Sequence, residues 1–372
     1  MRKKRKLAIV VKSVDGGTGT YLLTLQKLRG FEIRNFILEK PKYRQLPFPT
    51  KKNSVFFHRK GFYPPHYFIS LRHIVNFLEE IFWLQKKVAS FNPDVVIGVD
   101  IHANLLTMIC KLFSRRKFLT VLTTHINLEK TLTEKSTPPL KDLITKIASF
   151  FYNKADYNLC VSNGVARSLE TTLKLKKEPV VIYNGVPLVK NKKTKTNQNI
   201  IISIARFDEQ KDLESLVKAF LLVQKKIPDS QLWLGGEGPQ KPSLERLVKK
   251  LGLTDKAKFL GWIDPSFISR ADVFVLSSKR EGFSYVLLEA MALGLPVIST
   301  DTPFGPPEIL ENGEYGILVA PGKVRVLASS IIEILRDRGK ASLYARKSRE
   351  RSKFFSEEKM LSAYERLVSS LT

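Results

Sequence analysis

The sequence has little cysteine, no long apolar run and few acidic residues. Its two cysteines, Cys110 and Cys160, lie in separate apolar runs, which argues against a disulfide framework and a paired-cysteine metal site and favours a reducing compartment. No apolar run approaches the roughly 18 residues of a membrane-spanning helix. The run after the basic N-terminus, residues 7–11, is too short for a signal peptide. We therefore expect a cytoplasmic protein without a transmembrane helix.

Acidic residues are outnumbered: 35 Asp and Glu face 62 Lys and Arg, which gives a net charge of +27. Such a charge favours anionic partners: nucleic acid, acidic lipid or phosphorylated substrates. The segment from Lys40 to Tyr67 concentrates basic residues and interleaves them with aromatic ones. That mixture suits an anionic membrane surface, and it equally suits a solvated basic face over a core. Nucleic acid is a third interpretation, but no nucleic-acid-binding module is recognisable.

The order of expected elements predicts two domains. Apolar runs of strand length alternate with helical stripes, such as the one over residues 71–88, and this alternation predicts a doubly wound parallel α/β sheet in each half. The polar, basic stretch 189–198 is the expected linker. It separates a domain at 1–188 from one at 199–355, and a last helix occupies 356–372.

In the first domain, candidate ligand contacts follow two expected strands. Gly16 and Gly17 lie between a strand and a helix without matching a dinucleotide fingerprint, so they form either a ligand-facing loop or a plain tight turn. His125 follows the strand 118–124, and Asp100 and His102 follow the strand 94–99. Ligands of open α/β sheets bind outside the carboxyl ends of the strands, so His125 is well placed to contact a substrate. The alternative is a structural role, which is the usual one for a lone histidine.

In the second domain, Arg206 and Lys211 share the loop after the strand 199–204. A guanidinium and an ammonium on one such loop suit a diphosphate.

The segment 281–289 carries the most specific pattern. It follows the apolar strand 273–276, and Ser284 is the expected cap of a helix that ends at Gly294. Gly282 permits close backbone approach, and the N–H groups around Phe283 and Ser284 suit a phosphate. Glu281 lies in the loop before this helix, and Glu289 lies about five residues into it, about 7 to 8 Å along the axis. The two carboxylates would repel phosphate and are better suited to sugar hydroxyls. Together these parts match a nucleotide-sugar.

Taken together, these motifs resemble the retaining family 4 glycosyltransferases of the GT-B fold. The match covers nearly the whole chain and is densest over residues 201–321. The family pattern appears there as Arg206-x4-Lys211, Gly235-Gly236-x-Gly238-Pro239, Gly261-Trp262, Glu281-x7-Glu289, Gly294-x-Pro296-Val297 and Gly305-Pro306-Pro307-Glu308. One departure is Asp212, since the family often has glycine after the lysine.

The resemblance implies two Rossmann-like domains facing a cleft, with the last helix packed back on the first domain. The second domain would bind a nucleotide-sugar, with UDP as the default, and the first would bind a glycan or lipid-linked acceptor. It also implies retention of anomeric configuration with no cofactor and no metal; the metal-binding Asp-x-Asp motif does not occur. In this reading Arg206 and Lys211 neutralise the leaving diphosphate, Glu281 contacts the donor sugar, Glu289 contacts the ribose, and His125 lies on the sugar or acceptor side.

The segment Gly305–Ile309 is most similar to members that act on lipopolysaccharide, capsule or lipid-linked oligosaccharides. We therefore expect a peripheral enzyme at the inner face of the cell membrane. Two alternatives remain at this point: a nucleotide-sugar epimerase of the GT-B fold, and a non-enzymatic protein that binds anions or nucleic acid.

Overall fold

The computed structural model describes residues 4–39, 53–57, 71–129, 133, 138–189 and 198–369. The chain divides into two compact units. The first runs to Tyr183 and also takes the chain from Leu361 onward, and the second spans Asn184–Met360. Most of the expected linker and most of the segment from Lys40 to Tyr67 lie outside the described residues. The sequence also predicts a mobile loop over residues 128–139, and most of it lies outside them as well.

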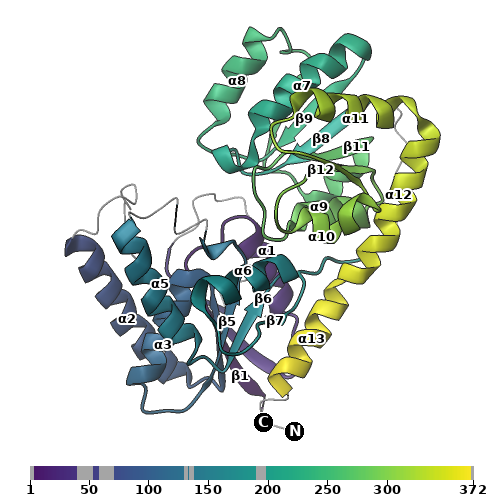
Figure 1. Ribbon diagram of the computed structural model, residues 1–372. Coiled ribbons are helices and arrows are strands. Elements are labelled where there is room, and N and C mark those ends of the chain that lie inside the picture. The colour runs from purple at the N-terminus through teal and green to yellow at the C-terminus, as the bar shows by residue number, and fades with distance from the viewer. Residues whose placement is uncertain are drawn as a thin grey trace. The chain divides into compact units, whose positions relative to one another are not determined.

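The first unit is built on a parallel sheet with strand order β3-β2-β1-β4-β5-β6-β7 (Figure 1). These strands are β1 (Arg5–Val11), β2 (Phe31–Ile37), β3 (Ser54–Phe56), β4 (Val95–Val99), β5 (Leu119–Thr124), β6 (Tyr157–Cys160) and β7 (Val180–Val181). The central strands β1 and β4 are buried on both faces, which is why their sequences are continuously apolar rather than alternating. The doubly wound parallel sheet predicted for this half is confirmed.

Helices cover both faces of this sheet. They are α1 (Gly17–Leu25), α2 (Leu71–Phe91), α3 (Asp100–Phe113), α5 (Pro138–Tyr152) and α6 (Asn163–Leu173). Right-handed crossovers place α1 on one face and the remaining four on the other, because the strand order reverses between β3 and β4. Accordingly, Ala8 and Val10 of β1 share a core with buried residues of α2 and α3. Ser162 caps α6, its hydroxyl accepting from the backbone N–H of Val165 at 3.1 Å.

The stripe predicted over residues 71–88 forms a helix, but half of it does not face the core. Leu84, Val88 and Phe91 are buried, whereas Ile74, Val75, Leu78 and Phe82 are 49, 42, 47 and 69% exposed. The helical spacing of apolar residues predicts which side of the helix is apolar, but it does not predict whether other parts of the protein cover that side.

The second unit has its own parallel sheet, in the order β10-β9-β8-β11-β12-β13. Its strands are β8 (Ile200–Ile204), β9 (Gln231–Gly235), β10 (Ala257–Gly261), β11 (Val273–Leu276), β12 (Val297–Thr300) and β13 (Ile317–Val319). The α-helices are α7 (Leu213–Lys226), α8 (Lys241–Lys250), α9 (Tyr285–Ala292), α10 (Pro306–Ile309), α11 (Val324–Arg336) and α12 (Arg338–Ser352). Phe220 of α7 and Ile331 of α11 pack in one core with the buried strands.

One expected boundary in this unit is wrong. The sequence predicts a helix over residues 323–338 that Gly339 ends, but α11 stops at Arg336 and Gly339 lies in the first turn of α12. Asp337 makes this break, since its carboxylate accepts from the backbone N–H of Lys340 at 2.8 Å and caps α12. Helix α12 is mostly polar, so the sequence has no clear apolar stripe that would predict a separate helix there.

The last helix, α13 (Glu357–Ser369), starts as predicted at Ser356, whose hydroxyl accepts from the N–H of Lys359. Beyond Leu361 it belongs to the first unit. There the Tyr364 hydroxyl meets the Tyr21 hydroxyl of α1 at 2.6 Å, both side chains being fully buried. The predicted return of the last helix to the first domain is confirmed.

No helix among the described residues is both long and apolar enough to span a bilayer.

Candidate functional site

The loops at the carboxyl end of the second sheet are built around two glycines of the Gly235–Pro239 turn. Gly236 has φ +126°, and a Cβ there would lie 1.9 Å from the Ala205 carbonyl oxygen. A Cβ on Gly238 would lie 2.4 Å from the Phe207 carbonyl oxygen. Without side chains at these two positions, the loop after β9 packs closely against the loop after β8, which carries Arg206. The glycines therefore help to position Arg206.

Lys211 and Glu281, assigned separate roles from the sequence, form an ion pair with each other. The Lys211 ammonium lies 2.6 Å from Glu281 Oε1, and the two side chains are only 16% and 8% exposed. The Ser278 hydroxyl donates to the same carboxylate oxygen at 2.7 Å, and the Ser277 hydroxyl donates to the Lys211 carbonyl at 2.8 Å. The pair thus ties the loop after β8 to the loop after β11.

Asp212 explains the departure from the family pattern after this lysine. Its backbone is left-handed, with φ 46° and ψ 43°, as it turns the short 3-10 helix Glu209–Lys211 into α7. Glycine adopts this conformation without strain, and aspartate is among the few other residues that tolerate it. The departure therefore keeps the turn that presents Lys211.

Arg206 lies on the same loop but not in the Lys211 cluster. Its guanidinium pairs with Asp208 at 2.9 Å, and its side chain is 43% exposed. An exposed pair of this kind is weak, so the guanidinium is available to exchange its partner for a ligand phosphate.

Gly282, Phe283 and Ser284 lead into α9. Phe283 is buried with its ring 5.3 Å from that of Phe355, and its carbonyl accepts from the Asn184 side chain. Ser284 occupies the expected cap position, but its hydroxyl makes no capping hydrogen bond, so the prediction is right in place and wrong in mechanism.

Glu289 is the fifth residue of α9. Burial raises its pKa to about 7, and the negative charge of Asp264 adds to the rise. A carboxyl group poised near neutrality within a ligand-binding edge is a functional candidate.

In the first unit, His125 lies directly after β5, as predicted. Its backbone N–H donates to Asp100 Oδ1 at 3.2 Å, which joins the ends of β4 and β5. Its ring meets the ring of Tyr21 edge-on, with centroids 4.5 Å apart, and Tyr21 belongs to the helix that Gly16 and Gly17 open. Burial lowers the pKa of His125, with the Asp100 carboxylate opposing the change. Its Nε2 atom is shielded and has no hydrogen-bond partner among the residues that the structure describes.

The structure also contains a second cluster around a histidine, which the sequence does not predict. Glu80 of α2 is 3% exposed, and its carboxylate lies 2.7 Å from His102 Nε2 at the start of α3. Asp100, two residues earlier, has a left-handed φ of 64°, an unusual conformation for a residue other than glycine. His102 was noted as lying at a strand end. Only the fold brings Glu80 to it, because nothing in the spacing of residues 80 and 102 links them.

Two family models divide the chain between them. "Glycosyltransferase Family 4" matches residues 16–190, and "Glycosyl transferases group 1" matches residues 187–351. The lipopolysaccharide core biosynthesis glycosyltransferase LpsE of Rhizobium meliloti is 31% identical over 241 residues, which cover 62% of this chain and 68% of LpsE. The chain is a family 4 glycosyltransferase.

Further similarities agree with this family. A Campylobacter jejuni enzyme named N-acetylgalactosamine-N,N'-diacetylbacillosaminyl-diphospho-undecaprenol 4-alpha-N-acetylgalactosaminyltransferase is 29% identical, the match covering 58% of this chain and 60% of that protein. The crystal structure of Anabaena HepE in complex with UDP superposes with a TM-score of 0.77 at 18% identity, covering 98% of this chain and all of that one. The latter shows that the glycosyltransferase has the GT-B fold, as predicted.

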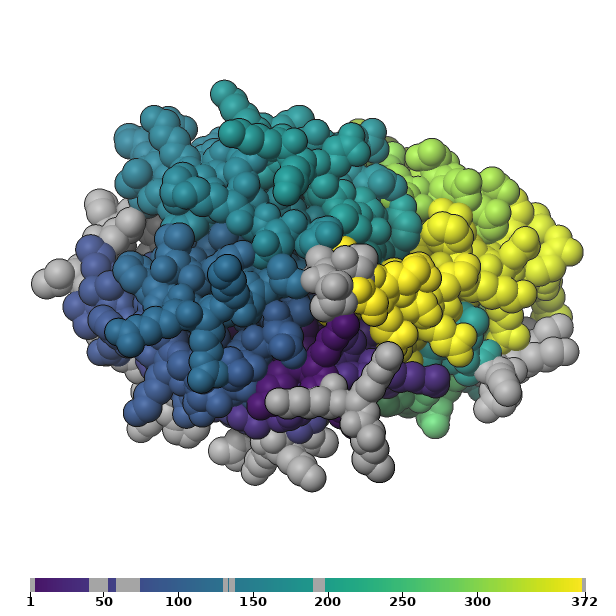
Figure 2. Space-filling view, turned by 90° about the horizontal axis from the view of Figure 1, so that it is seen from below, coloured from purple at the N-terminus to yellow at the C-terminus, as the bar shows by residue number. Residues whose placement is uncertain are grey.

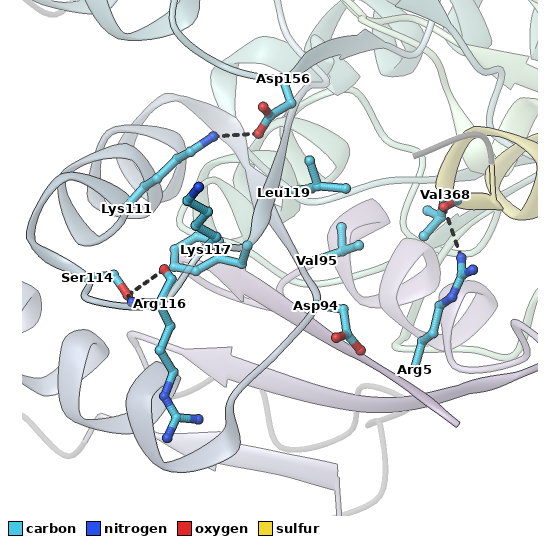
Figure 3. Close-up of a pocket in the computed structure, with 11 residues that line it drawn as sticks. Arg5, Asp94, Val95, Lys111, Ser114, Arg116, Lys117, Leu119, Asp156 and Val368 are labelled. Carbon is cyan, nitrogen blue, oxygen red and sulfur yellow. Dashed lines mark hydrogen bonds and ion pairs between the residues drawn. The ribbon is translucent and has the colours of Figure 1, made fainter. Parts of the chain in front are cut away.

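A pocket of about 620 Å³ lies away from these sites, at the amino ends of β4 and β5 (Figure 3). Lys111 pairs there with Asp156, and Arg5 donates to the Val368 carbonyl oxygen. Arg116 and Lys117 also line it. Because ligands of doubly wound folds bind at the opposite ends of the strands, we do not assign this pocket to glycosyl transfer.

Proposed function

We propose that this protein is a retaining, metal-independent glycosyltransferase that moves a sugar from a UDP-sugar to a glycan or glycolipid acceptor at the cytoplasmic face of a membrane. The observation that carries the donor side is the buried Lys211–Glu281 pair at the carboxyl edge of the second sheet. An ammonium has three donors, and Glu281 takes one of them, so the others are left for a diphosphate. The UDP bound to the structurally similar HepE supports the nucleotide assignment.

The leaving group defines the roles of the cations. As the bond from the anomeric carbon to the phosphate oxygen breaks, negative charge develops on the diphosphate, and Lys211 and Arg206 neutralise it. The acceptor oxygen bonds to the same face of the anomeric carbon, and the departing phosphate oxygen takes the acceptor proton. No protein nucleophile and no metal ion enters this scheme. Glu281 holds Lys211 in place and offers its second carboxylate oxygen to a sugar hydroxyl.

Glu289 and the first unit complete the scheme. The Glu289 carboxylate accepts hydrogen bonds from the ribose, as the family resemblance suggests. We assign the acceptor to the carboxyl edge of the first sheet, where His125 and the Glu80–His102 pair lie. A neutral His125, its pKa lowered by burial, suits hydrogen bonding to an uncharged sugar rather than charge neutralisation. The names of LpsE and of the Campylobacter enzyme support a lipid-linked acceptor.

The donor proposal is tested by thermal shift of the full chain with UDP, GDP, ADP and their sugar conjugates, with double-stranded DNA as control. A ligand that binds only the folded state raises the melting temperature. We expect a rise with uridine nucleotides that is reduced in Arg206→Ala, and no loss of the rise when a chelator is added. A rise with DNA and with no nucleotide refutes the proposal.

Transfer itself needs a separate readout. Release of UDP in the presence of a lipid-linked acceptor, followed by assignment of the product anomer by NMR, decides between retention and inversion. A product with inverted configuration refutes the retaining mechanism while leaving the donor assignment intact.

A further inference from the structure

Three neighbouring helices of the first unit expose an unusual number of large apolar side chains. Of the 14 such side chains in the described residues, nine belong to α2, α3 and α5. They are Ile74, Val75, Leu78, Phe82, Leu112, Phe113, Leu143, Ile147 and Phe150. Phe82 and Phe113 are 69% and 71% exposed, so they contribute almost nothing to the core.

These side chains belong to one layer of the unit. Helices α2, α3 and α5 cover the same face of the sheet, with α3 in contact with both of the others (Figure 1). On α3, Ile101 and Leu105 are also only half-buried. In the space-filling view, the residues in the blue range of the colour bar form a continuous part of the surface (Figure 2). Monomeric proteins rarely expose a broad apolar area unless it binds something.

The charges around this area are predominantly positive. Among the charged residues of α2, α3, α5 and the residues that directly follow α3 and α5, six exposed ones are basic and two are acidic. The basic ones are Lys86, Arg115, Arg116, Lys117, Lys146 and Lys154, and the acidic ones are Glu79 and Asp142. Three of the basic residues, Arg115 to Lys117, follow Leu112 and Phe113 after one serine. Arg116 and Lys117 also line the pocket in Figure 3. Phenylalanine beside arginine and lysine is the combination that binds the boundary between lipid tails and anionic headgroups.

We propose that the outer side of α2, α3 and α5, together with residues 115–117, is a docking surface for an anionic phospholipid bilayer. This surface rests on the membrane part of the proposed function and gives it a location. The apolar side chains enter the lipid, and the basic side chains meet the phosphates. In the sequence, the segment from Lys40 to Tyr67 ends four residues before α2 begins at Leu71 and has the same basic and aromatic composition.

The test is flotation of the full chain with vesicles of phosphatidylcholine alone, or with added phosphatidylglycerol. We expect binding to the anionic vesicles that weakens as salt is raised. The double substitution Phe82→Ser and Phe113→Ser removes two exposed rings and is expected to lower the partition coefficient about tenfold or more. Replacing Arg115, Arg116 and Lys117 by glutamine is expected to weaken binding mainly at low salt.

The matched control is Val326→Ser with Leu343→Ser, two side chains of the second unit that are 50% and 40% exposed. This variant is expected to bind vesicles like the unaltered chain. Wild-type binding that equals that of the Phe82/Phe113 variant overturns the proposal, as does failure to bind anionic vesicles. Self-association that the Phe82/Phe113 variant abolishes, seen by analytical ultracentrifugation without lipid, also overturns it in favour of a second copy.

The thermal shift with uridine nucleotides separates this proposal from the proposed function. If the surface variants lose vesicle binding but keep the shift, the surface is supported and the donor site is intact. If the unaltered chain binds vesicles but shows no shift, the surface stands and the donor assignment fails.

Discussion

The Lys211–Glu281 pair gives the sharpest quantitative prediction, because its geometry and burial are both defined. At 2.6 Å the attraction between the two charges is about 6 kcal/mol at an effective dielectric constant of about 20. Desolvation offsets much of this, yet removal of one partner leaves the other charge buried and alone. We therefore expect Lys211→Met and Glu281→Gln each to lower the free energy of unfolding of the second unit by about 3 kcal/mol.

The double variant separates pairing from packing. With both charges removed, we expect a loss smaller than the sum of the single losses by about 2 kcal/mol or more. The assay is urea unfolding followed by tryptophan fluorescence. Of the three tryptophans, Trp83 lies in the first unit, whereas Trp233 and Trp262 lie in the second. A Trp83→Phe background therefore makes the signal report on the second unit alone.

The control pair is Glu214–Lys218, which has the same 2.6 Å separation but side chains 59% and 49% exposed. Its coupling is expected to be about 0.3 to 0.5 kcal/mol. If the Lys211 and Glu281 effects add within about 0.5 kcal/mol, burial does not strengthen the pair and the reasoning is refuted. If the coupling energy between Lys211 and Glu281 is as large as expected but the single variants keep full transfer activity, the role assigned to the two residues in catalysis is refuted.

Three further predictions concern other parts of the two sites. UDP-glucose affinity is expected to fall up to about tenfold per pH unit below about pH 7, because a protonated Glu289 carboxyl accepts fewer hydrogen bonds from ribose hydroxyls. This pH dependence should vanish in Glu289→Gln. UDP-glucose is the ligand of choice because it lacks the terminal phosphate that itself titrates near pH 6. Gly236→Ala is expected to lower the free energy of unfolding by about 3 kcal/mol or more, because the added Cβ conflicts with the Ala205 carbonyl oxygen. The control is Gly252→Ala, at φ +68° with open space around it, which is expected to lower the free energy of unfolding by about 1 kcal/mol. Equal melting curves for the two variants would contradict this. Glu80→Ala is expected to raise KM for the acceptor several-fold through loss of the His102 contact, with unchanged UDP-glucose affinity by calorimetry and partial rescue in Glu80→Gln; a change in donor affinity instead would place the pair elsewhere.

The fold was readable from the sequence because parallel strands buried on both faces are continuously apolar. The apolar runs at residues 95–99 and 273–276 are therefore recognisable as buried strands. Loops at the carboxyl ends carry charged and polar residues that a core does not need, so the sequence places Arg206, Lys211, Glu281 and His125 in the strand-end loops where the structure has them. Helix α12 was missed because it has almost no apolar stripe.

The sequence by itself determined the family, the two doubly wound sheets and the loops that hold the candidate site residues. These depend on local pattern and on motif order along the chain. Only the tertiary structure decided which residues meet. It pairs Lys211 with Glu281 and Glu80 with His102, and it leaves half of the α2 stripe exposed. The physical reason is that contacts between strand ends and the covering of a helix face depend on how elements distant in sequence pack together, and local periodicity carries no information about that packing.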